Sequence, residues 1–206
     1  MKDLKYVHIT KCAGTFIEEM GRDNNIKWGR HHKEYGWWHE TFITKPEKIK
    51  NKYDWFVIVR NPYTRLLSEY YCQWGGINHE SCKNIKIETN DDFNNYLIKK
   101  INSRNNKSDD KLCVGHHYTE QYKYIDNDIP MHVIKLENLN TELQVLFDKY
   151  NINIIISNYK KMNNKENKND ILPYTIDNFN EELINLINEV YDKDFQLFDY
   201  NKLVKN

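Results

Sequence analysis

The feature that most constrains the fold of this chain is an apolar run that leads through a short polar loop into a helical pattern. The run covers Leu4–Ile9, Lys11 lies in the loop, and the helical pattern covers Gly14–Arg22. A strand, a tight loop and a helix in this order present backbone N–H groups and the positive end of the helix dipole. Gly14 allows close backbone approach, Thr15 adds a hydroxyl and Lys11 adds a positive charge. The segment therefore predicts a phosphate-binding loop.

A second unit of the same kind begins at Trp55–Val59, a β-branched and aromatic run that predicts a buried strand. Pro62 suits the first turn of a helix, and apolar residues then recur at helical spacing as far as Trp74. Arg60 therefore lies at the carboxyl end of a strand, where open α/β sheets bind ligands, and Ser68 lies about two turns into the helix. An arginine at this place offers a forked, permanently charged grip on a second phosphate.

Further apolar patterns alternate strands with helices along the rest of the chain. Strands are expected near Ile26–Trp28 and at Met131–Leu136. Helices are expected in the segments Asp91–Ile101, Tyr118–Ile125, Leu139–Tyr150 and Phe179–Tyr191. Alternation of this kind is typical of an α/β fold with a central, mainly parallel sheet flanked by helices. At 206 residues the chain is long enough for one sizeable core, so we expect a single domain over residues 1–206.

Composition excludes several classes of partner. With 30 basic and 30 acidic residues the chain carries no overall charge that would draw it to nucleic acid or to a membrane surface. The sequence contains no apolar run of transmembrane length and no signal peptide, so we expect a soluble, cytoplasmic protein. The four cysteines lack a metal-binding spacing, and the pair His116-His117 lacks ligands at such a spacing, so no metal is expected.

The order Lys-x-x-Gly-Thr at residues 11–15 resembles the 5′-phosphosulfate loop of sulfotransferases that use 3′-phosphoadenosine 5′-phosphosulfate (PAPS). The motif Arg-Asn-Pro-x-x-Arg-x-x-Ser-x-Tyr at residues 60–70 is similar to the 3′-phosphate motif of the same enzymes. The segments Gly29–His32, Glu137–Leu139 and Glu189–Tyr200 show a weaker resemblance to the Golgi carbohydrate sulfotransferases, which act on heparan and chondroitin sulfate. The resemblance implies a P-loop-like sulfotransferase fold, PAPS as donor, no metal, and a glycan or other hydroxyl compound as acceptor.

The same resemblance implies roles for individual residues. Lys11 would stabilise the leaving group, and His31 would be the general base that deprotonates the acceptor, with His32 and His39 as rivals and Glu40 as a further one. Two other groups are implied. The donor-binding residues would be Lys11, Cys12, Ala13, Gly14, Thr15, Phe16, Arg60, Arg65 and Ser68, and the acceptor-binding residues His117 and Gln121.

Two other functions remain open from the sequence. A kinase-like P-loop enzyme would place its lysine after the last glycine and would need Mg²⁺. A non-catalytic relative would bind a nucleotide or glycan without needing Lys11 or a histidine base. Within the sulfotransferase interpretation, a tyrosyl peptide or a small alcohol remains an alternative acceptor.

Overall fold

The computed structural model describes residues 2–28, 39–104, 115–159 and 174–205. The chain forms two compact units. The first, which we call the sheet unit, comprises Met1–Arg60 and Lys123–Lys168; the second, the helical unit, comprises Asn61–Tyr122 and Asn169–Asn206. The prediction of one domain over the whole chain stays a prediction, and each unit is described separately below.

Three parallel strands form the sheet of the first unit, in the spatial order β1 (Leu4–Val7), β2 (Asp54–Val59) and β3 (Met131–Lys135). In the register, Lys5 pairs with Trp55 and Trp55 pairs with Met131. Since all three strands run the same way, the segments that follow β1 and β2 leave the same edge of the sheet. The predicted α/β class with a parallel sheet flanked by helices is confirmed.

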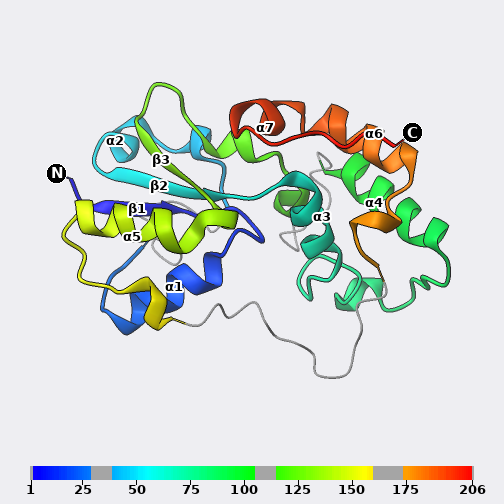
Figure 1. Cartoon of the computed structure of the whole chain (residues 1–206), viewed down its shortest axis with the longest axis horizontal. Coiled ribbons are helices and arrows are strands. Elements are labelled where there is room, and N and C mark those ends of the chain that lie inside the picture. The colour runs from blue at the N-terminus through cyan, green and yellow to red at the C-terminus, as the bar shows by residue number, and fades with distance from the viewer. Residues whose placement is uncertain (1, 29–38, 105–114, 160–173, 206) are drawn as a thin grey trace. The chain divides into compact units, whose positions relative to one another are not determined.

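Neighbouring residues of β2 point to opposite faces of the sheet, and both kinds are apolar, so both faces are covered by other segments. On one face, the Phe56 ring lies edge-on to Trp28 and to Phe147 of α5 (Leu139–Lys149), and the Trp28 and Phe147 rings stack with centroids 5.5 Å apart. Figure 1 shows α5 running alongside the strands. On the opposite face, Trp55 contacts Phe42 of η2 (Phe42–Thr44), and its indole N–H donates to the carbonyl of Lys50 at the end of α2 (Glu47–Lys50). Aromatic side chains thus form both layers of this core.

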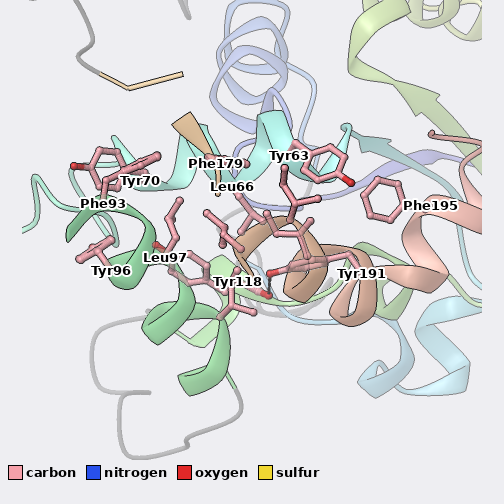
Figure 2. Packing of buried hydrophobic residues seen from close by; sticks show 14 of the residues in the cluster. Tyr63, Leu66, Tyr70, Phe93, Tyr96, Leu97, Tyr118, Phe179, Tyr191 and Phe195 are labelled. Atoms are coloured by element: carbon pink, nitrogen blue, oxygen red, sulfur yellow. Dashed lines mark hydrogen bonds between the residues drawn. The ribbon is translucent and has the colours of Figure 1, made fainter. Parts of the chain in front are cut away.

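The helical unit is built from α3 (Pro62–Tyr70), α4 (Asn90–Ser103), α6 (Glu181–Val190) and α7 (Asp192–Leu197). It also contains the short 3₁₀ turns η3 (Glu80–Cys82), η5 (Gly115–Tyr118) and η9 (Ile176–Asn178), and the first half of η6 (Gln121–Tyr124). Figure 2 shows its apolar core, in which side chains from α3, α4 and α6 meet. The labelled members are Tyr63, Leu66, Tyr70, Phe93, Tyr96, Leu97, Tyr118, Phe179, Tyr191 and Phe195.

Local signals explain where the helices of this unit begin. The Asn61 side chain accepts from the Tyr63 N–H, and Pro62 occupies the first helical position of α3. Thr89 and Asp92 form a reciprocal capping box at the start of α4. Each cap satisfies backbone donors that the helix itself leaves without an acceptor.

Three predicted elements differ from the structure. The helix expected over Pro62–Trp74 ends at Tyr70, because the chain folds back at two glycines: a Cβ atom on Gly76 would lie 2.2 Å from the carbonyl oxygens of Glu69 and Tyr70. Residues 26–28 form no strand, although the Trp28 carbonyl accepts from the Tyr6 N–H. The helix expected over 118–125 is replaced by the 3₁₀ turns η5 and η6 (Gln121–Tyr124).

Candidate functional site

The loop between β1 and α1 (Gly14–Asp23) has an unusual backbone. Lys11 and Ala13 both adopt left-handed conformations, with φ of 58° and 60°, although neither is glycine. Such a conformation costs an L-residue about 1–2 kcal/mol, and strain of this kind clusters at ligand-binding sites. Ala13 is the N-cap of α1, and within the described chain no side chain caps this helix and no acidic residue lies in its first turn. The positive end of the α1 dipole is therefore left for an external anion.

Two side chains hold this loop in place. The Tyr6 hydroxyl donates to the Cys12 carbonyl at 3.0 Å, and Nη1 of Arg60 donates to the Lys11 carbonyl at 3.3 Å. Cys12 is fully buried, while Lys11 is half-buried and Thr15 is exposed. The buried members of the predicted loop thus serve its shape, and Lys11 and Thr15 are the side chains that solvent reaches.

Arg60 lies directly after β2, as predicted, at the same edge of the sheet as the loop. Its bond to the Lys11 carbonyl brings a guanidinium charge to the loop itself. Lys11, Arg60 and the amino end of α1 together make this edge of the sheet unit a cluster of positive charge suited to a phosphate or sulfate group.

His8 is a residue that the sequence analysis did not assign. A Cβ atom on Gly14 would lie 1.6 Å from Nε2 of His8, so the imidazole lies directly against the glycine. The structure thus gives a second reason why residue 14 is a glycine, besides the close approach of an anion. Any larger residue there would displace the His8 ring. The signal was present in the sequence, since His8 ends the first apolar run immediately before the loop.

Of the three histidines predicted as the base, His39 falls within the described residues, and His31 and His32 lie outside them. The further candidate Glu40 is also described, and it forms an ion pair with Lys45 at 3.3 Å. The His39 ring meets the His8 ring edge-on, with centroids 4.5 Å apart, and its Nδ1 lies 3.3 Å from the His8 carbonyl. Because a carbonyl only accepts, Nδ1 carries the proton in this bond, and the lone pair of neutral His39 then resides on Nε2. That tautomer suits a base, although the residue is buried.

The remaining predicted residues belong to the helical unit. Ser68 is a half-buried residue of α3. Arg65, by contrast, is buried, and its guanidinium donates to the carbonyls of Thr119 at 2.8 Å and His117 at 3.0 Å. These two hydrogen bonds explain why an arginine is buried at this position. The predicted role of Arg65 in donor binding stays a prediction.

His117 and Gln121, predicted to bind the acceptor, are both buried. Nδ1 of His117 lies 2.7 Å from a carboxylate oxygen of Glu69. Burial disfavours the charged imidazole, but hydrogen bonds to Cys72 and Glu69 outweigh this effect and raise the pKa of His117 to about 9. The Gln121 N–H donates to the carboxylate of Asp194, and burial raises the pKa of Asp194 to about 6. Both residues thus have internal contacts, and their acceptor role stays a prediction.

Among the described residues, one group is spaced closely enough to hold a metal ion: Glu69, Cys72 and His117, all in the helical unit. Sequence spacing does not indicate this group, because Glu69 and His117 are 48 residues apart along the chain and meet only in the folded unit.

The comparisons with known proteins give one match. A family model described as "Sulfotransferase family" matches residues 2–201, nearly the whole chain. No curated protein and no solved structure matches significantly. In the part of the chain that the structure describes, no helix is both long and apolar enough to cross a membrane.

Proposed function

Since the chain belongs to the sulfotransferase family, we propose that it transfers the sulfuryl group of PAPS to a hydroxyl group of a carbohydrate. The observation that carries the proposal is the loop of the sheet unit, where a strained backbone, the uncapped α1 and two cationic side chains, Lys11 and Arg60, come together. The lysine precedes the glycine, which favours a phosphosulfate loop over the kinase-like alternative.

In the proposed reaction the acceptor oxygen attacks sulfur in line with the bond to the 5′-phosphate oxygen. The new O–S bond forms as the old one breaks, the hydroxyl proton passes to a base, and 3′,5′-diphosphoadenosine leaves. Such a transfer requires alignment and charge stabilisation more than covalent catalysis. Lys11, half-buried at the loop, would neutralise the charge that develops on the leaving oxygen.

The donor's phosphates are assigned by their chemistry and by the motifs. Backbone N–H groups of residues 13–16 and the Thr15 hydroxyl would receive the 5′-phosphosulfate. Arg60, with Ser68 and Arg65 as further ligands, is assigned to the 3′-phosphate from the resemblance of residues 60–70. The bond from Arg60 to the Lys11 carbonyl adds a role in shaping the 5′ loop.

The base is assigned to a histidine that precedes β2. His31 is the residue that the motif favours, and His39 is the alternative supported by its contact with His8, whose ring packs on Gly14. The carbohydrate acceptor rests on the likeness to carbohydrate sulfotransferases in the sequence.

Transfer of radiolabelled sulfate from PAPS onto a panel of glycans, tyrosyl peptides and phenols tests the proposal directly. We expect label on a glycan without added metal, and we expect 3′,5′-diphosphoadenosine to raise the unfolding temperature by binding the native state. Label on peptides or phenols alone would show that the acceptor is not a carbohydrate, while sulfuryl transfer itself would stand. Equal stabilisation by ATP with Mg²⁺, together with no transfer to any acceptor, would reject the function.

A further inference from the structure

Three side chains of different chemistry meet inside the helical unit. Glu69, Cys72 and His117 each contribute one possible ligand atom, and these atoms lie within 4.8 Å of one another. All three residues are buried, and Glu69 has no exposed surface. A carboxylate, a thiol and an imidazole are a costly combination to remove from water unless they bind one another or a shared cation.

The local sequence brings two of these groups together at the carboxyl end of α3. Glu69 lies in the last turn of α3 and Cys72 follows three residues later, with its N–H donating to the Glu69 carbonyl at 2.9 Å. Residues three apart on a helical turn are neighbours. The spacing Glu-x-x-Cys therefore presents a carboxylate and a sulfur toward the same place.

The third group is fixed from two directions. Arg65, one turn before Glu69, donates to the His117 carbonyl and so ties η5 to α3. Gly75 lies against the imidazole, since a Cβ atom there would be 2.9 Å from Nδ1 of His117. The ring therefore has a closely defined position beside Glu69 and Cys72.

A second observation is that the neighbours of Glu69 satisfy only one of its two carboxylate oxygens. One carboxylate oxygen of Glu69 bonds to His117, but the other, Oε1, is buried and has no hydrogen-bond partner among the described residues. A buried carboxylate oxygen without a partner is unfavourable, so this position suits a hydrogen-bond donor or a cation.

We propose that Glu69, Cys72 and His117 bind a Zn²⁺ ion that stabilises the helical unit. Thiolate, imidazole and carboxylate are the three ligand types of zinc sites, whereas Mg²⁺ and Ca²⁺ require oxygen ligands. Zinc binds such atoms at about 2.0–2.3 Å in a tetrahedron, so the ligand atoms lie about 3.3–3.8 Å from one another. Glu69 Oε2 and His117 Nδ1, which are 2.7 Å apart, would therefore separate to admit the ion. Binding would replace the hydrogen bond between Glu69 and His117 and release the protons held by Cys72 and His117, because the ligands bind deprotonated.

The test measures metal content, metal absorption and thermal stability, so its result does not depend on sulfuryl transfer. The whole chain, purified without a histidine tag, is equilibrated with Zn²⁺, passed through gel filtration and analysed by elemental mass spectrometry. We expect stoichiometric zinc and a higher unfolding temperature than after treatment with a chelator. Replacement by Co²⁺ should produce the intense near-ultraviolet absorption of a cobalt–thiolate bond.

Matched variants identify the ligands. Cys72→Ser should abolish the cobalt–thiolate absorption, and His117→Gln should lower zinc content at least tenfold. Cys82→Ser is the control: Cys82 is buried in the same unit but bonds to Ser81 and Tyr96, so this variant should keep both signals. If a variant fails to fold, the cobalt spectrum and zinc content of the wild type still test the proposal. Zinc-free wild type after equilibration, or an absorption that survives Cys72→Ser and disappears in Cys82→Ser, would overturn the proposal.

Discussion

The two units use similar polar residues in opposite ways. In the sheet unit, Lys11 and Arg60 lie at the edge of the sheet on a strained loop and retain access to solvent. In the helical unit, Arg65, His117 and Gln121 are buried and bonded to their own chain. A charged residue that solvent reaches is available to a ligand, whereas a buried one first has to satisfy its neighbours. In our proposal the sheet unit therefore binds the 5′-phosphosulfate, whereas the described contacts of Arg65, His117 and Gln121 stabilise their own unit.

The largest effect is expected at the base. His31→Ala should lower turnover by about 10²–10⁴, the range typical of a lost general base, while PAPS affinity stays nearly unchanged. His32→Ala and His39→Ala should be milder. Initial rates at saturating PAPS, with the nucleotide Kd from calorimetry, measure both quantities.

His39 offers the sharper version of this test, because its ring contacts His8 beside the loop. Should His39→Ala be the inactive variant while His31→Ala remains active, the role passes to His39 and the mechanism holds. Normal turnover in all three variants would exclude a histidine base and favour Glu40.

The second largest effect is expected at the loop. Lys11→Ala should lower turnover by about 10²–10³, as for other donors aimed at developing charge, and should weaken nucleotide binding much less. Lys48→Ala, an exposed lysine on α2 of the same unit, is the control and should leave both quantities unchanged. Unchanged turnover of Lys11→Ala at saturating PAPS would remove Lys11 from catalysis.

The sequence predicted what short-range patterns determine. Two strand–loop–helix units were located because apolar runs, Gly14 and Pro62 act within a few residues of one another. The parallel sheet followed from the alternation of strands and helices, and the structure confirms it.

Contacts between distant segments could not be predicted in this way. The end of α3 at Tyr70 depends on Gly76 packing against the carbonyls of the helix, and the burial of Arg65 depends on η5, about fifty residues later. Glu69 and His117 meet for the same reason. Hydrophobic periodicity indicates which face of a helix or strand is apolar. It does not indicate which polar group of a distant segment will contact a charged side chain.

A pair of arginines from one motif tests the comparison between the units. Arg65→Met should lower the free energy of unfolding by about 2–4 kcal/mol, because two buried carbonyls lose their donors. Arg60→Met should change stability little but weaken binding of 3′,5′-diphosphoadenosine by about 2–5 kcal/mol, as for a charged donor removed from a phosphate. Denaturant unfolding and calorimetry measure the two effects. A stable Arg65→Met variant with weakened nucleotide binding would instead make Arg65 a donor ligand.

The smallest effect is a pH dependence in the helical unit. Burial raises the pKa of Asp194 to about 6, although N–H groups of Gln121 and Tyr122 partly offset it. Native Asp194 therefore holds its proton more tightly than the unfolded chain does. Its contribution to stability is greatest below the ordinary aspartate pKa and is lost as the pH rises through about 6. Each pKa unit corresponds to about 1.4 kcal/mol, so this loss is at most about 3 kcal/mol.

Urea unfolding isolates this contribution when wild type and Asp194→Asn are compared between about pH 3.5 and 7. This range spans the ordinary aspartate pKa and the raised pKa of native Asp194. The wild type should lose stability relative to the variant as the pH rises. The neighbouring Asp192 is the matched control, because its hydrogen bond to Lys202 lowers its pKa. Its contribution is therefore present at neutral pH and lost on acidification, so the difference between wild type and Asp192→Asn should have the opposite slope. A flat difference curve for Asp194→Asn would show that its two backbone donors offset burial completely, and that this buried carboxylate is as well solvated by the protein as by water.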